Sequence, residues 1–486
     1  MTSEKNVSSL SRHITNRRQG RVVTPLNNSF GDQMTLCSWA KKRMPEYLWL
    51  CLILMEYGRE KGFEKAGTIL KNISTQITTL SEPKLSQIFG MTHEEQVSVF
   101  QIILNQIEPF VLSPLTVLYR AKDYPEFNEA FNVLEIHFEE RLKKIAKAVE
   151  IYFPHQSDEA TDIRFLIIGF QMFCGRLKIS KDLTHTIEAL SNYPHTSHDD
   201  EKMEMYRPII RAMEGAFGDN ENSDFTSKFW ESIGMITKCN IISIMHKESE
   251  SDYHLFIEQF RKILEYVTNS YKKESLLDDR FDVIVGSITY ALKVFCELHD
   301  NNLGNGILGR HGVRTIIEIL IILKYLLKRE NDYPKIWGEY KLYGIGKYKL
   351  ILLKARENEL EESAHFVPLV ADMLVNEIKW EEFIDVDLKY FDKQGIREKS
   401  IEVGEKYLYD LFYDYDSSFA HGLWGAIREA SMLKCNNASH QYHIVPDIFA
   451  VQNLPDVKAD CFRIMMCLLD LLKQNYTIPE TLMMLD

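Results

Sequence analysis

A polar stripe on one predicted helix near residue 415 carries the side chains best suited to chemistry. Its members are Tyr407, Asp410, Asp414, Ser417 and His421. Spacings of three and four residues place them on one helix face, opposite an apolar face of Leu408, Phe412, Tyr415, Phe419 and Leu423. Asp414 or Ser417 could orient His421 and tune its pKa, as a general base requires. The alternative is a histidine hydrogen-bonded within a helix packing point.

A second candidate is the helix predicted to begin at Arg314. Its sequence is apolar almost all round, which predicts a central, buried position. Arg314 and Glu318 are four residues apart and face the same way. Because a buried charge is costly unless it is paired, the two form either a structural ion pair or a pair that directs Arg314 into a polar pocket.

A glycine-rich turn precedes that helix, and Gly304, Gly306 and Gly309 spell G-x-G-x-x-G. A dinucleotide site would need a strand before this motif, but residues 281–298 have helical periodicity. The N–H groups at the helix start could instead hold a phosphate. The candidate phosphate ligands are Arg310, His311 and, if the later helix continues past Gly422, Arg428. A plain helix-to-helix turn is the alternative.

Metal ligation has a weaker signal. Cys435, His440 and His443 give C-x4-H-x2-H, and His195 and His198 give H-x2-H in a polar loop. The spacing of both motifs is weak evidence for zinc, and no partner pair stands near His195 and His198. The sequence therefore predicts no metal site and no cofactor.

These residues are carried by a helical chain. The 486 residues are 45% hydrophobic and 26% charged, with few glycines and prolines, and long segments of helical period follow one another from residue 45 onward. We expect an all-α fold, a multi-helix bundle array. The predicted divisions are a basic flexible tail over 1–30, an N-terminal helical domain over 31–265 and a C-terminal helical domain over 266–486.

The net charge and the cysteines indicate which partners and which cellular compartment to expect. The net charge of −13 disfavours nonspecific nucleic-acid binding outside a local basic patch. Eight scattered cysteines without C-x-x-C pairs indicate a reducing, cytoplasmic location. The apolar runs are shorter than the roughly 20 residues a membrane-spanning helix needs, so no membrane is expected as a partner.

The order of motifs resembles a known family. An R-x-x-x-E helix (Arg314, Glu318) followed by a helix ending S-x-x-x-H-G (Ser417, His421, Gly422) is similar to an uncharacterised bacterial helical domain of unknown function. That family is distantly similar to HEPN-type domains, many of which are metal-independent ribonucleases in toxin and phage-defence systems. The resemblance implies a HEPN-like C-terminal bundle. It also implies His421 as general base, with Arg314 or Arg310 stabilising the transition state. HEPN domains place an arginine shortly before the histidine, and this chain has none there.

Two functions follow as expectations. The first is a helical scaffold or sensor of a phage-defence or toxin system, with a polar pocket around His421 that binds a ligand, a protein partner or a second copy of the chain. The second is a metal-independent endoribonuclease acting on RNA. The convergence of Arg310, Arg314, Asp414 and His421 in one pocket would favour the second.

Overall fold

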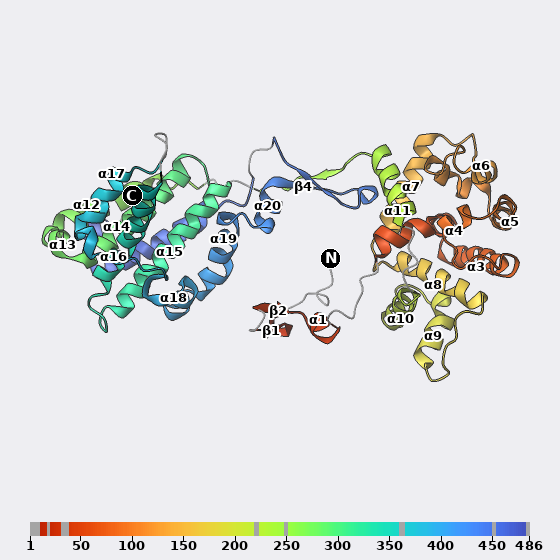
Figure 1. The fold of residues 1–486 in the computed structure, drawn as a ribbon, viewed down its shortest axis with the longest axis horizontal. Coiled ribbons are helices and arrows are strands. Elements are labelled where there is room, and N and C mark those ends of the chain that lie inside the picture. Colours follow the sequence, from red (N-terminus) through yellow and green to blue (C-terminus); the bar gives the residue numbers. More distant parts are fainter. Residues whose placement is uncertain are drawn as a thin grey trace. The chain divides into compact units, whose positions relative to one another are not determined.

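The computed structural model describes residues 10–16, 20–30, 38–217, 223–246, 251–358, 365–449 and 453–482. The chain divides into two compact units (Figure 1). Unit 1 comprises Met1–Ile241 and Lys434–His443, and unit 2 comprises Ile242–Leu433 and Ile444–Asp486. The division lies before the predicted boundary at 265/266, which falls inside helix α12 (His254–Ser270). The short return segment 434–443 packs with the N-terminal part of the chain.

The predicted all-α class is confirmed, because helices dominate both units. Among the described residues, the strands are short. β1 (Ile14–Asn16) and β2 (Arg21–Val23) form an antiparallel hairpin within the segment predicted as a basic tail. A second sheet has the order β3–β4–β5, with strands Ile241–Ile242, Met432–Cys435 and Ile444–Pro446. No helix in the described ranges combines the length and apolar character that crossing a membrane requires.

Unit 1 is built around α2, which is apolar on every side. Its residues 48–54 are all buried, so neighbouring helices must cover its whole circumference. The helices of this unit are α1 (Pro25–Phe30), α2 (Leu48–Tyr57), α3 (Arg59–Gln76), α4 (Leu85–Phe89), α5 (His93–Leu104), α6 (Pro125–Phe131), α7 (Phe138–Tyr152), α8 (Asp158–Phe173), α9 (Thr184–Asn192), α10 (Met203–Gly215) and α11 (Ser223–Ile236).

Unit 2 is built around α15 (Ile307–Arg329), and the prediction that this helix lies deep in its bundle is confirmed. Its apolar residues from Ile316 to Leu326 are mostly buried, against α14, α19 and α21 among others. The further helices of the unit are α12 (His254–Ser270), α13 (Lys272–Leu277), α14 (Asp279–Asp300), α16 (Ile336–Glu357), α17 (Pro368–Ile378), α18 (Ile396–Glu402), α19 (Asp414–Ala420), α20 (Trp424–Ser431) and α21 (Lys458–Asn475).

Candidate functional site

A cavity of about 820 Å³ opens beside α15 in unit 2. Its walls come from α14, α15, α16, the end of α17 and the segment around Tyr390. The lining is rich in tyrosine and includes the two charged residues singled out on α15, Arg314 and Glu318. The tyrosines that line it are Tyr290, Tyr340, Tyr343, Tyr348 and Tyr390. Burial raises the pKa of Tyr340 to about 12, so its hydroxyl stays protonated at neutral pH.

Arg314 is held at this wall by partners from two other segments. Its Nε donates to Ser417 Oγ at 3.0 Å and its Nη2 donates to Tyr413 Oη at 2.7 Å. The guanidinium also lies over the Tyr413 ring, 4.6 Å from its centre. Arg314 Nη1 is 3.6 Å from Glu318 Oε2, so the predicted pair on one helix face is present. Ser417 completes its own bonding by donating to Tyr413 O at 2.6 Å.

Glu318 is satisfied by two tyrosine hydroxyls. Tyr390 Oη donates to its Oε1 at 2.6 Å, and Tyr413 Oη donates to its Oε2 at 2.9 Å. Burial, and then the nearby Glu318 charge, raises the pKa of both tyrosines, so they remain hydrogen-bond donors at ordinary pH. Arg314, Glu318, Tyr413, Tyr390 and Ser417, hereafter the Arg314 network, therefore form a closed polar arrangement at one side of the cavity.

The predicted stripe is displaced from its expected face. Residues Leu408–Tyr413 form a π-helix that runs directly into α19. A π-turn takes up more residues than an α-turn, so it shifts the phase of every later side chain. The buried residues are Tyr413, Asp416 and Phe419, whereas Tyr415 and Leu423, predicted for the core, are 41% and 55% exposed. The assignment of those two residues to the apolar face is wrong.

His421 lies at the end of α19, where it is exposed. In the part of the chain that the structure describes, its imidazole has no hydrogen-bond or ion-pair partner, and it is not among the cavity-lining residues. Asp414 is exposed too and bonds Tyr409, while Asp410 pairs with Lys406. The stripe therefore supplies Ser417 to the Arg314 network, but the expectation that Asp414 or Ser417 orients His421 is not met.

The continuation of the stripe to Arg428 is also wrong. Helix α19 ends before Gly422, whose φ of +58° is a conformation that glycine adopts without strain, and a separate helix, α20, begins at Trp424. Arg428 Nη1 donates to Met432 O at 2.6 Å at the end of that helix. The guanidinium thus caps α20.

The glycine-rich turn at the start of α15 has a structural role in packing. A Cβ at Gly309 would lie 2.6 Å from Leu303 O, so this turn requires glycine. Arg310 is 1% exposed and donates to Gly304 O at 3.2 Å and Pro455 O at 2.6 Å. A cation buried in this way holds the turn against the segment before α21 rather than presenting its charge to a phosphate. His311, the residue after Arg310 on α15, is half-buried.

Asp416 faces Arg310 from α19, with its Oδ1 4.0 Å from Arg310 Nε. It is 2% exposed. Burial raises the pKa of this carboxyl to about 7, although the Arg310 charge opposes the shift. The sequence analysis did not single out this residue, although it follows Phe412 by four residues and precedes Phe419 by three, a spacing that places it on the apolar face.

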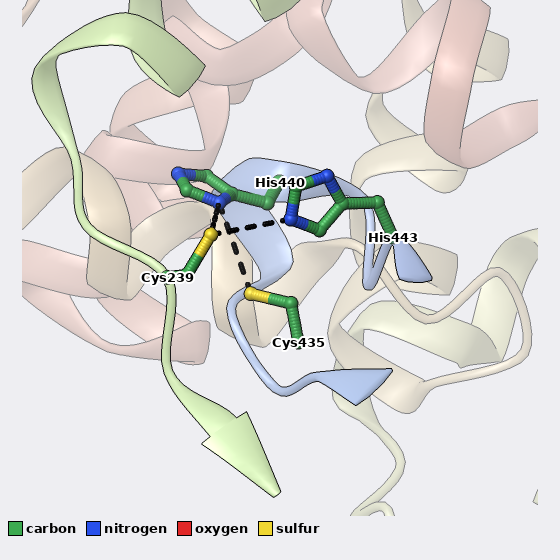
Figure 2. Close-up of side chains that lie close together, drawn as sticks. All are labelled: Cys239, Cys435, His440 and His443. Atoms are coloured by element: carbon green, nitrogen blue, oxygen red, sulfur yellow. Dashed lines mark hydrogen bonds between the residues drawn. The ribbon is translucent and has the colours of Figure 1, made fainter. Parts of the chain in front are cut away.

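Unit 1 contains a cluster that the sequence showed only in part. Cys239, Cys435, His440 and His443 each direct one potential ligand atom to a common point, and these atoms all lie within 4.8 Å of one another (Figure 2). The sequence predicted no metal site, because the spacing C-x4-H-x2-H is by itself weak evidence for zinc. The structure brings Cys239 to that motif from far upstream, where a lone cysteine gives no local signal.

Comparison with known protein families identifies a match to part of the chain. No curated protein and no solved structure matches the chain. Residues 287–440 do match a family of unknown function (DUF5677). This stretch includes Arg314, Glu318, Ser417 and His421, and also Cys435 and His440, but neither Cys239 nor His443. This similarity agrees with the uncharacterised domain of unknown function expected from the sequence.

Proposed function

We propose that the protein is a helical sensor or scaffold whose unit 2 binds a small organic ligand in the cavity beside the Arg314 network. The observation that carries this proposal is the cavity itself. Its volume of about 820 Å³ lies in the range of about 300–1,000 Å³ typical of small-molecule sites. Apolar and aromatic walls with a few fixed polar groups are the usual composition of such sites. The proposed pocket has Arg314 and Glu318 in its wall, and His421 is not among its lining residues.

The charges of the cavity indicate the chemistry of its ligand. Three carboxylates, Asp282, Glu318 and Glu377, face two cations, Arg314 and Lys341. Lys341 is already bound by Asp279 and Asp282, at 2.8 Å each, and Arg314 is engaged in its network. An anionic ligand would therefore find no uncommitted cation among these lining residues. Tyrosine faces and carboxylates favour a neutral or positively charged aromatic molecule, through stacking and cation–π contact.

Ligand binding can be tested with a variant that fills the cavity without disturbing the fold. Gly286 lines the cavity on α14, and a Cβ there meets no atom within 4 Å. Gly286→Leu should therefore occupy ligand space and leave the helix intact. Gly234→Leu on α11 is the matched control, because that glycine also has open space and lies in unit 1.

The measurement is a thermal-shift screen of the full chain against nucleosides and aromatic amines. We expect at least one compound to raise the unfolding midpoint of the wild type and of Gly234→Leu, and to leave Gly286→Leu unchanged. A compound that shifts all three proteins equally binds elsewhere. A screen without any shift contradicts the proposal for these two ligand classes.

Ribonuclease activity, and a role in phage defence or toxicity, rest on the family resemblance alone and stay predictions. His421 N bonds Ser417 O at 3.0 Å, so the histidine follows Ser417 by one helical turn. A ribonuclease would use this imidazole as its base and would need Arg314 to leave its present partners. Incubation of the purified protein with a mixed RNA pool, with His421→Ala as control, tests this: cleavage by the wild type and not by the variant would favour it.

A further inference from the structure

We propose that Cys239, Cys435, His440 and His443 bind a structural zinc ion in unit 1. Two sulfurs and two imidazole nitrogens form the Cys2His2 ligand set that Zn²⁺ takes in closed, four-coordinate sites. Because all four ligands come from the protein, no position remains for a substrate, and the role is structural. The proposal is independent of ligand binding in unit 2.

The distances between the ligand atoms fit one metal ion. Cys239 Sγ lies 3.2 Å from His440 Nδ1 and 3.3 Å from His443 Nε2, and Cys435 Sγ lies 3.7 Å from His440 Nδ1 (Figure 2). In a tetrahedral site, with zinc about 2.3 Å from sulfur and about 2.0 Å from nitrogen, a sulfur and a nitrogen ligand are about 3.5 Å apart. The three observed distances bracket this value.

The second ring nitrogen of His440 is bonded as it is in metal sites. His440 Nε2 lies 2.9 Å from Thr237 Oγ1 and 3.3 Å from Thr237 O. A hydrogen on Nε2 leaves Nδ1, the atom that faces both sulfurs, as the free lone pair. Metal-binding histidines usually donate their outer N–H to a backbone carbonyl or a similar acceptor, which fixes the ring and its tautomer. Thr237 therefore acts as the positioning residue for His440.

The local fold brings the ligands together from two segments. Cys239 follows the end of α11, Cys435 ends β4, and Cys435 N bonds His443 O at 2.9 Å, so the return segment folds back on itself. Gln441 and Tyr442, between the two histidines, have positive φ values of 54° and 52°. This tight turn is what points both imidazoles at the same sulfur.

The metal would tie the return segment to the end of α11. Asn437 Nδ2 already donates to Lys238 O at 2.8 Å, next to Cys239. A zinc ion adds a cross-link between residues that are separated in sequence by the 242–433 part of unit 2. Thiolate and imidazole ligands favour zinc over the hard cations Mg²⁺ and Ca²⁺, which prefer oxygen.

Metal content of the full chain is the first test. Protein purified without a metal-affinity step should carry about one equivalent of zinc by mass spectrometry. Cys239→Ser should lower the zinc content about tenfold or more, because one of the two thiolates is lost. Cys467→Ser is the matched control, since Cys467 is also exposed but lies outside the cluster, and it should keep its zinc. Equal zinc contents in the two variants would overturn the assignment.

Cobalt titration covers the case in which Cys239→Ser fails to fold. Co²⁺ added to metal-free wild type should give the visible absorption bands of a tetrahedral thiolate site, which added Zn²⁺ abolishes. Thr237→Val, which keeps the carbonyl but loses the hydroxyl, should weaken Co²⁺ binding by up to about tenfold. Metal-free wild type that gives no such bands, or protein whose Cys239 and Cys435 are recovered as a disulfide that excludes metal after purification under reducing conditions, would refute the zinc site.

Discussion

The Arg314 network in unit 2 and the cysteine–histidine cluster in unit 1 are both assembled from distant segments, yet they satisfy their polar atoms in different ways. In the network, the guanidinium, two tyrosine hydroxyls and a serine hydroxyl each face a bonding partner. In the cluster, two thiols and two imidazoles face one another around a common point. A network whose polar groups are all hydrogen-bonded stabilises the fold and forms part of the cavity wall. Thiol and imidazole groups that point to one place instead indicate a binding site for a metal cation.

Metal removal should have the largest effect and should separate the two regions. Structural zinc contributes about 10 kcal/mol or more of binding free energy in small zinc domains. A strong chelator should therefore greatly speed backbone hydrogen exchange in residues 434–443 and leave α15 protected. The measurement is hydrogen–deuterium exchange by mass spectrometry with and without chelator. Unchanged exchange at 434–443 would show that hydrogen bonds and packing alone hold this segment.

Asp416 provides the second-largest effect, because it is a buried carboxyl in unit 2 whose Oδ1 is as far as 4.0 Å from Arg310 Nε. Its folded pKa, raised to about 7 by burial, lies above the usual value of 3.8, so folding favours the protonated carboxyl. The free energy of unfolding should then fall as the pH rises from about 4 to 7 and level off above that, by up to about 4 kcal/mol.

Asp416→Asn isolates this contribution. The variant should be more stable than the wild type at pH 8, and the difference should shrink toward zero near pH 4 to 5. Urea unfolding at several pH values measures it. A difference that does not depend on pH would mean that the carboxylate is ionised and well paired with Arg310 throughout.

Arg314→Ala should lower the free energy of unfolding by about 1–3 kcal/mol, because it removes the donors to Ser417 and Tyr413 and leaves Glu318 without its cation. The two charged side chains are each 26% exposed, which keeps the cost below that of a fully buried pair. Arg463→Ala, which breaks a surface pair with Asp460, is the control and should cost less than about 0.5 kcal/mol. Equal effects in urea unfolding would show that the network is only a surface contact.

His421→Ala should have the smallest effect on stability, within about 0.5 kcal/mol, since the exposed imidazole has no partner among the described residues. Thermal unfolding of the variant measures this. A large loss of stability would place His421 in the packing of unit 2 and would also remove it as a candidate base.

The sequence was sufficient to predict features that depend on regular helical periodicity. The apolar circumference of α15 predicted its burial, and the spacing of Arg314 and Glu318 predicted their pairing. The same reasoning failed after residue 408, where a π-helix shifts the helical phase so that Tyr413 is buried and Tyr415 is exposed. Amino-acid types alone do not reveal such a phase shift, because π- and α-helices accept similar residues.

Local sequence patterns could not predict sites whose residues come from segments far apart in the sequence. C-x4-H-x2-H was visible as a motif, but its fourth ligand, Cys239, lies in another segment with no motif around it. Likewise, Tyr390 reaches Glu318 from a separate stretch of the chain. Tertiary packing brings Cys239 and Tyr390 to their sites, and residue spacing along the sequence does not predict such packing.

X-ray absorption at the zinc edge tests the central contrast between the two regions most directly. For the purified full chain, the zinc coordination shell should contain two sulfur atoms at about 2.3 Å and two nitrogen atoms at about 2.0 Å. A shell of nitrogen and oxygen atoms without sulfur would place any bound zinc elsewhere and would contradict the assignment of Cys239, Cys435, His440 and His443 as its ligands.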